Sequence, residues 1–500
     1  MSDRSRPSSR APRKNGEKSG RNTPPAPKDP ARRAAYDVLR AVQDRDAYAN
    51  LLLPSLLRER SVHGRDAALA TELTYGALRR QGTYDAILDA CIDRSLESVD
   101  SEVLPVLRLG AHQLLATAIP PHAAVSATVD LARRVVGHHR GRFANAVLRK
   151  VGRRSLDEWT AVVAPDRAAD PAGHLSVVHS HPRWIVDAFA AALGEAPAHG
   201  GAPEPEAAAG AAGADPGAPL AETERLLAAD NERPRVTLVA KPGRAAVDDL
   251  LAGGATAARF SPYAAYLPEG DPALLREVRQ RRAAVQDEAS QLVALALTRV
   301  GVDGPDARWL DACAGPGGKA ALLAGLAGAR DARLLAAEAQ PARAGLVAGA
   351  VERSPRDAAR TVVADATRPP WGAGVFDRVV VDAPCTGLGA LRRRPEARWR
   401  RTPETAEALA PLQRDLLRSA LDSTRAGGVA AYVTCSPHPD ETRGVVEAVL
   451  AERGDAEVLR AADYLDGVPD VAAGPSGEYV QFWPHRHGTD AMFLALVRKR

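Results

Sequence analysis

The chain has 500 residues, is 45% hydrophobic and carries a formal net charge of +4. A chain of this length can bury more than one core, so we expect a multidomain soluble protein. Because no run of about 18 uncharged apolar residues could cross a bilayer and the N-terminus is hydrophilic, we expect a cytoplasmic protein with no membrane partner.

The four cysteines are Cys91, Cys313, Cys385 and Cys435. They lie too far apart for a Cys-x-x-Cys pair, and histidines at zinc-ligand spacing are absent. We therefore expect free thiols, no disulfide framework and no metal. A free cysteine is commonly a small buried hydrophobic residue, which is our interpretation of the side chains of Cys91 and Cys313.

The N-terminus is strongly basic. Residues 1–33 carry a net charge of +7, which leaves −3 for the rest of the chain. Residues 1–30 are rich in Ser, Pro, Gly and Arg and have no apolar periodicity, so we predict a disordered basic tail. It is either a solvated leader or an arm that attracts phosphates.

Residues 31–155 are predicted to form an all-α bundle, because apolar residues recur there at spacings of three and four. We interpret Gly137 to Gly141 as a turn, so the last helix of the bundle is expected to begin near Phe143.

Residues 174–280 are predicted to form a small α/β linker domain, with helices over 184–193 and 245–251 and a strand over 235–240. Residues 199–219 are almost wholly Ala, Gly, Pro and Glu, which indicates a flexible insertion.

Residues 281–500 alternate between strands and helices, which predicts a mostly parallel, doubly wound sheet whose ligands bind beyond the carboxyl ends of the strands. The main strands are expected at 308–312, 333–337, 361–364, 377–381, 428–433 and 492–498.

A glycine-rich loop follows the first of these strands and opens a helix. Cofactor contacts are expected from Cys313, Ala314, Gly315, Pro316, Gly317, Gly318 and Lys319. It is no Walker A loop, because Cys313 stands where Gly is required and Ala320 where Ser or Thr is required.

The glycine loop fits both a dinucleotide and S-adenosylmethionine. Glu338, Asp365 and Asp382 end the next strands, and three carboxylates suit hydroxyls, an adenine amine and a sulfonium better than a pyrophosphate. They favour S-adenosylmethionine as the cofactor.

Two cysteines end apolar strands. Cys385 follows Val380-Val381-Asp382, and Cys435 follows Tyr432-Val433-Thr434. Neighbouring strands lie about 4.8 Å apart, so both thiols could face one substrate.

The arginine loop, residues 391–401, follows Cys385 closely. Arginine pairs with phosphates and stacks on bases, and tryptophan offers a platform for an unpaired nucleotide. The predicted RNA contacts are Arg392, Arg393, Arg394, Arg398, Trp399 and Arg400.

The motifs Asp311 to Lys319, Asp382 to Gly387 and Thr434 to Pro437 together resemble those of the NOL1/NOP2/Sun RNA cytosine-C5 methyltransferases. The helical region, with His122 to Ser126 and Phe143 to Arg149, resembles the NusB-like domain of the RsmB (Sun/Fmu) branch. The resemblance covers residues 31–500 apart from the insertion. Residue 338 departs from the family pattern, because Glu stands where Asp is usual.

The resemblance implies a NusB-like helical RNA-binding domain followed by a Rossmann-like class I methyltransferase domain. It assigns Cys435 as the nucleophile that bonds to cytosine C6, Cys385 as the residue that assists product release, and Asp382 as a contact of the base. The implied cofactor is S-adenosylmethionine. The implied partner is RNA, with 16S small-subunit rRNA as the first expectation, and we expect the protein to be a monomer.

Three alternatives stay open. The same chemistry could act on tRNA. The protein could be a non-catalytic RNA-binding factor that uses its NusB-like bundle, although the two thiols, Asp382 and the glycine loop argue against this. A nicotinamide oxidoreductase would instead bind a dinucleotide.

Overall fold

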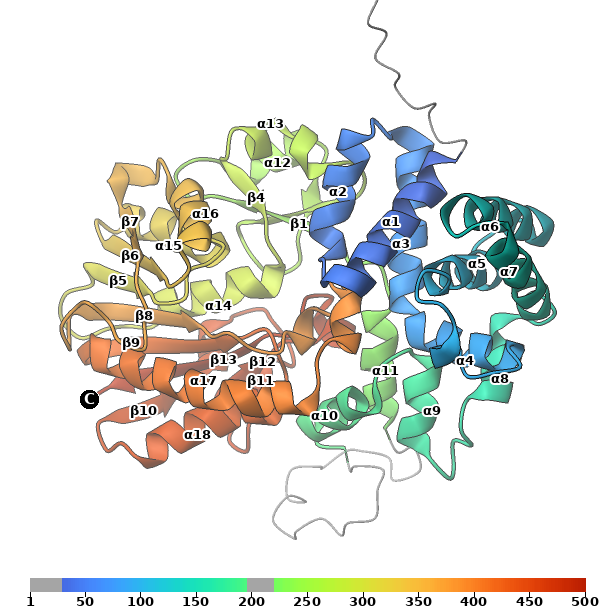
Figure 1. Cartoon of the computed structure of the whole chain (residues 1–500). Helices are drawn as coiled ribbons and strands as arrows, with labels where there is room; N and C mark the ends of the chain where they lie inside the picture. Colours follow the sequence, from blue (N-terminus) through green and yellow to red (C-terminus); the bar gives the residue numbers. More distant parts are fainter. Residues whose placement is uncertain (1–28, 196–219) are drawn as a thin grey trace, which may run out of the picture.

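The computed structural model describes residues 29–195 and 220–500. Figure 1 shows a helical domain on the right, an α/β domain on the left and a smaller region that connects them. Residues 1–28 of the predicted basic tail and all of the predicted insertion, residues 199–219, lie outside the described residues. No helix in the described ranges is long and apolar enough to span a membrane.

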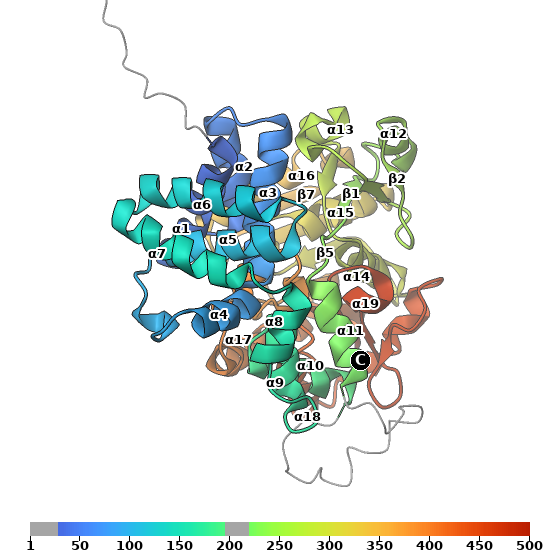
Figure 2. The same cartoon turned by 90° about the vertical axis from the view of Figure 1, so that its right-hand side faces the viewer.

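The helical domain packs around a core of its own, which includes Leu73, Tyr84 and Leu107. Figure 2 shows its helices from the outer side. The helices are α1 (Pro30–Arg45), α2 (Ala49–Glu59), α3 (Gly64–Arg79), α4 (Gln81–Cys91), α5 (Leu104–Ala116), α6 (Pro121–Val135), α7 (His138–Val151) and α8 (Leu156–Val163).

Helix α7 begins earlier than predicted. Gly137 adopts a φ of 92° and ends the turn, so the helix starts at His138 and Gly141 lies inside it. A Cβ atom at Gly141 would lie 2.9 Å from Cγ of Arg133 in α6. Gly141 therefore allows close helix packing, a role that a turn signal in the sequence does not reveal.

The connecting region contains α9 (Pro171–Val178), α10 (Arg183–Leu193), α11 (Ala221–Asp230), α12 (Val247–Ala252) and α13 (Arg276–Arg279). A four-stranded sheet has the order β2-β3-β1-β4 and consists of β1 (Val236–Ala240), β2 (Thr256–Ala257), β3 (Ala264–Leu267) and β4 (Ala283–Val285). Only β1 is a predicted strand, because the other three are too short to show a period.

The large sheet of the α/β domain has the order β11-β12-β13-β9-β8-β5-β6-β7, with β10 paired to β13. Strands β9, β8, β5, β6 and β7 run parallel, and β13 is antiparallel to β9. The strands are β5 (Arg308–Asp311), β6 (Arg333–Glu338), β7 (Ala359–Val363), β8 (Phe376–Asp382), β9 (Thr424–Thr434), β10 (Ala456–Leu459), β11 (Ala472–Ala473), β12 (Tyr479–Gln481) and β13 (Phe493–Lys499).

Both faces of the large sheet are buried. Val380 belongs to a core with α14 and α15, whereas Val379 and Val381 belong to a core with α17 and α18, because successive side chains of a strand point to opposite faces. The helices are α14 (Glu288–Arg299), α15 (Gly318–Ala329), α16 (Pro341–Val351), α17 (Pro403–Ser423), α18 (Arg443–Ala451) and α19 (Pro484–His487).

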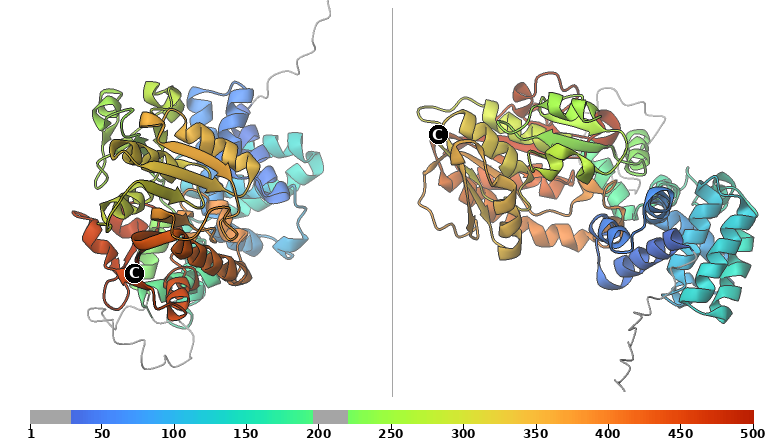
Figure 3. Two further views of the ribbon diagram at one scale, coloured as in Figure 1. Left: turned by 90° about the vertical axis from the view of Figure 1, so that its left-hand side faces the viewer. Right: turned by 90° about the horizontal axis from the view of Figure 1, so that it is seen from above.

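The fold class is therefore confirmed: a helical domain precedes a doubly wound α/β domain with an antiparallel addition. Seen from above, the helical domain lies beside the α/β domain (Figure 3). The arrangement leaves the carboxyl ends of the parallel strands as the expected ligand edge.

Candidate active site

The two strand-end thiols meet. Strands β8 and β9 are parallel neighbours with Asp382 opposite Val433, so the segments that follow them leave the sheet at the same edge. Sγ of Cys385 lies 3.4 Å from Sγ of Cys435. This distance permits a hydrogen bond between the thiols and allows both to face one substrate atom.

The surroundings give the two thiols different acidities. The hydrogen bond from Cys385 lowers the pKa of Cys435 against the effect of burial, and the charges of Lys319 and Arg394 lower it further. The same hydrogen bond, together with burial, raises the pKa of Cys385 well above its ordinary value. The positive charges beside Cys435 and the Glu441 carboxylate beside Cys385 favour Cys435 as the thiol that ionises first, although either sulfur can donate the hydrogen bond while both are protonated.

The loop that carries Cys385 is held by a buried carboxylate. Glu441, in the short helix η7 (Pro439–Glu441), accepts a hydrogen bond of 2.7 Å from the Thr386 backbone N–H and another from the Thr386 hydroxyl. Gln413 of α17 donates to Glu441 and to the Pro384 carbonyl. The residues on both sides of Cys385 are thus fixed.

Lys319 and Asp382 form an ion pair beside the thiols. The Nζ–Oδ2 distance is 2.8 Å, and the Lys319 side chain is only 8% exposed. Burial alone would lower the pKa of Lys319, but the Asp382 carboxylate outweighs it and the pKa is raised. Lys319 is therefore a fixed positive charge, and it keeps Asp382 in place at the edge of the sheet.

The glycine loop approaches Glu338 closely. The backbone N–H of Gly315 donates to Oε2 of Glu338 at 3.1 Å, and Arg343 donates to the Gly315 carbonyl at 2.7 Å. A Cβ atom at Gly315 would lie 2.2 Å from Oε2 of Glu338. Gly317, at a φ of 113°, leads into α15. The backbone path requires glycine at 317, and the absence of a side chain at 315 leaves room for the Glu338 carboxylate.

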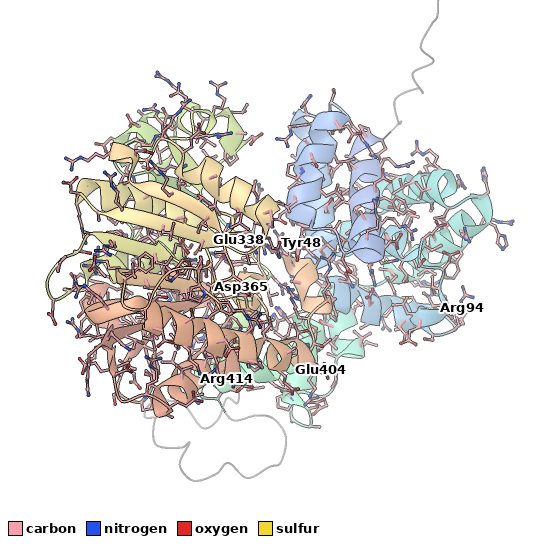
Figure 4. The ribbon with its side chains drawn as sticks, turned by 60° about the vertical axis from the view of Figure 1, so that its left-hand side comes forward. Tyr48, Arg94, Glu338, Asp365, Glu404 and Arg414 are labelled. Carbon is pink, nitrogen blue, oxygen red and sulfur yellow. The ribbon has the colours of Figure 1, made fainter. Side chains whose placement is uncertain are left out.

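Three carboxylates line this edge in addition to Asp382. Glu338 is buried at the end of β6 and Asp365 is exposed beyond β7, and Figure 4 shows both at the same edge of the sheet. Asp311 is buried at the end of β5, and burial followed by the charge of Asp382 raises its pKa to about 7. Within the described residues its Oδ1 has no hydrogen-bond partner, so an acceptor remains for a ligand.

Two of the predicted RNA-binding arginines are neutralised by protein carboxylates. Arg392 and Arg393 both pair with Asp287, the residue before α14, and with Asp490, at distances of 2.7 to 3.2 Å. These side chains hold the arginine loop to the α/β domain. The prediction that they bind RNA phosphates is not supported by this arrangement.

Arg398 is also structural. Its side chain is fully buried and donates hydrogen bonds to the carbonyls of Arg79, Ser180 and Asp230 and to the Asn231 side chain. It joins the arginine loop to the helical domain and the connecting region. The burial of the Arg398 side chain does not support the direct RNA contact that the sequence suggested.

The remaining members of the predicted RNA set differ in exposure. Arg400 donates to backbone carbonyls in the last turn of α1 and in its connection to α2. Trp399 is 38% exposed. Its ring packs against Gly82, where a Cβ atom would lie 2.4 Å from the ring. Arg394 is exposed. RNA contact stays a prediction for Arg394 and Trp399.

Glu441 and Gln413 are site residues that sequence reasoning did not find. Glu441 stands in Pro439-Asp440-Glu441, which is typical of the first turn of a helix, where acidic residues are common. Its only sequence signal is that it follows Cys435 by six residues. The contact with Thr386 exists only because β8 and β9 are adjacent.

Family models match both parts of the chain. The family model described as 16S rRNA methyltransferase RsmB/F matches residues 302–498, and that of the NusB family matches residues 29–153. The putative methyltransferase Rv1407 of Mycobacterium tuberculosis is 50% identical, over 95% of this chain and 97% of its own length.

More distant relatives cover most of the chain as well. The ribosomal RNA small subunit methyltransferase B of Xylella fastidiosa (strain 9a5c) is 33% identical, over 87% of this chain and 92% of its own. The crystal structure of PH0851 superposes with a TM-score of 0.72 at 20% identity, over 94% of this chain and 98% of that one, and so shares the fold.

Proposed function

This chain belongs to the RsmB/F family of S-adenosylmethionine-dependent rRNA methyltransferases, and on that premise we propose that it methylates C5 of a cytosine in 16S rRNA through a covalent bond to Cys435. The observation that carries the proposal is the 3.4 Å distance between Cys385 and Cys435. A single buried thiol would fit many structural roles, whereas two thiols at one ligand edge with opposite pKa changes fit attack followed by release.

Cys435 is the nucleophile. Cytosine C5 is a poor nucleophile, and a thiolate bonded to C6 gives it the character of an enamine carbon that can accept a methyl group. The lowered pKa of Cys435 supplies the thiolate, and the hydrogen bond from Cys385 is its largest cause. Asp382, oriented by Lys319, is placed to contact the base during the attack.

Cys385 assists the second half of the reaction. The Cys385 thiolate takes the C5 proton, the electron pair of the C5–H bond re-forms the C5–C6 double bond, and the Cys435 thiolate is expelled. Once Cys435 carries the cytosine, its negative charge is gone, and with it the main reason for the high pKa of Cys385. Glu441 and Gln413 hold Cys385 in reach of the adduct throughout.

The residues at the sheet edge fit the cofactor. S-adenosylmethionine supplies an electrophilic methyl group on a sulfonium. The backbone of residues 313–318 would cradle it, Glu338 and Asp365 would accept hydrogen bonds from its hydroxyl and amine groups, and Oδ1 of Asp311, which has no partner among the described residues, would offer a further acceptor.

Two substitutions and two RNAs test the proposal. Cys435→Ala should give no 5-methylcytosine in 16S rRNA when methylation is read by bisulfite sequencing. Cys385→Ala should accumulate a protein–RNA adduct that survives denaturant, assayed above about pH 8.5 so that the thiolate is populated. Methylation of tRNA but not of 16S rRNA would contradict the proposed substrate, and normal turnover by Cys385→Ala would contradict the roles of the thiols.

A further inference from the structure

The helical domain places an aromatic ring against the arginine loop. Tyr48 lies in the connection between α1 and α2 and is 40% exposed. The guanidinium groups of Arg394 and Arg400 lie over its ring, 5.6 and 5.4 Å from the centroid. The ring, not the hydroxyl, makes both contacts. Figure 4 shows Tyr48 between the helical domain and the edge that carries Glu338.

The position of Tyr48 is fixed by hydrogen bonds on both sides of it. Arg400 donates to the carbonyls of Val42 and Ala47, at 2.9 and 2.6 Å. The backbone N–H of Ala49 donates to the buried carboxylate of Glu396 at 3.1 Å. An exposed tyrosine held in this way is preorganised, so little conformational entropy would be lost if a ligand stacked on it.

Arg394 connects this ring to the reacting thiol. The segment that carries Arg394 is attached to Cys435 through the backbone, because the N–H of Gly389 donates to the Cys435 carbonyl at 2.8 Å and the N–H of Arg394 donates to the Ala390 carbonyl at 3.0 Å. Arg392 and Arg393 are neutralised by carboxylates, whereas Arg394 is exposed and lies over an aromatic ring. Its charge is therefore available to a phosphate next to a base bound at Cys435.

We propose that Tyr48 and Arg394 form a binding site for a nucleotide that flanks the target cytosine, with the base stacked on the exposed part of the Tyr48 ring and its phosphate paired with Arg394. This inference rests on the proposed function and deepens it, because the helical domain then contributes a residue to substrate recognition at the active site. Stacking of unpaired bases on aromatic rings and arginine pairing with phosphates are common means of binding single-stranded RNA.

The test measures RNA affinity without turnover. In a Cys435→Ala background, binding of a 16S rRNA transcript is compared for Tyr48→Ala, Tyr48→Phe and Arg394→Ala. Tyr48→Ala should weaken binding by about tenfold or more, within the range for loss of one stacked base. Tyr48→Phe should keep binding within about twofold, because the ring stays. Cofactor affinity and the thermal midpoint should not change in any of them.

Arg94→Ala is the matched control for Arg394. Arg94 is also exposed and also lies over an aromatic ring, 5.5 Å from the centroid of Phe143, at the far end of the helical domain (Figure 4). Arg394→Ala should weaken RNA binding about as much as Tyr48→Ala, with the double variant less than additive, whereas Arg94→Ala should bind like the parent.

The inference is overturned if Tyr48→Ala binds the transcript as tightly as the parent, or if Tyr48→Phe loses as much affinity as Tyr48→Ala. If Tyr48→Ala lowers the thermal midpoint so far that part of the protein is unfolded at the assay temperature, the loss of binding reflects lost stability. Tyr48 would then be a packing residue and not an RNA contact. Because binding is measured without methyl transfer, these outcomes are independent of whether the wild-type chain forms 5-methylcytosine.

Discussion

Replacing Cys385 with alanine is predicted to raise the pKa of Cys435 and so to slow its reaction with an alkylating agent. The 3.4 Å hydrogen bond from Cys385 is the largest cause of the low pKa of Cys435. A hydrogen bond to a charged acceptor contributes about 1.5–3 kcal/mol, and a thiol is a weak donor, so the lower end applies. A loss of about 1.5 kcal/mol corresponds to roughly tenfold slower alkylation of Cys435 at a given pH below its pKa.

The assay is the pH dependence of iodoacetamide alkylation at Cys435, followed by peptide mass spectrometry so that each thiol is read separately. Cys385→Ala should shift the alkylation profile to higher pH, because less Cys435 thiolate is present at a given pH. Cys385→Ser retains a donor and should shift it less. An unchanged profile in Cys385→Ala, or a shift to lower pH, would refute the hydrogen bond as the cause of the low pKa.

Three further predictions concern stability and cofactor binding. Burial raises the pKa of Asp230 from 3.8 to about 7, so the folded state holds this proton more tightly than the unfolded state and the contribution of Asp230 to stability falls as the pH rises from about 4 to 7. Asp230→Asn should flatten that decline in urea denaturation, and an equally steep decline would contradict it. Gly315→Ala should weaken S-adenosylmethionine binding about tenfold in calorimetry, because its Cβ would displace Glu338, whereas Gly345→Ala, with nothing within 4 Å, should not. Arg398→Ala should lower the free energy of unfolding by about 3–5 kcal/mol in the same urea experiment, because it leaves buried acceptors unpaired, and a loss below about 1 kcal/mol would be inconsistent with this.

The parts of the site that follow strand ends could be predicted from the sequence. Cys385 and Cys435 each come directly after a strongly apolar strand, and parallel strands bring their carboxyl ends together. The proximity of the two thiols therefore follows from the two apolar strands and from the parallel arrangement of those strands. The glycine loop and Glu338 could be predicted for the same reason.

The arginine loop could not be interpreted correctly from its composition. Six arginines around a tryptophan look like a solvated RNA-binding segment, but whether an arginine is free depends on carboxylates and carbonyls supplied from elsewhere. Asp287 and Asp490 are about 100 residues distant from Arg392 in sequence, and only the tertiary fold brings them together. No local sequence pattern predicts this contact.

Tyr48 was missed for a related reason. It stands in a polar stretch between two helices, next to Ala47 and Ala49, with no motif around it. Its significance arises from Arg394 and Arg400, which come from the other domain. Short strands such as β2 and β3 were also missed, because they are held by their partners and not by any sequence period of their own.

The arginine loop makes the two halves of this chain inseparable. Arg401 donates to the carbonyl of Thr386, next to Cys385, while Arg398 and Arg400 take their acceptors from the helical domain and the connecting region. An α/β domain cut away from the rest of the chain would leave Arg398 and Arg400 without these acceptors. Chimeras between homologues should therefore take the arginine loop and the segments that supply its acceptors from the same parent, and a junction after residue 155 would separate them.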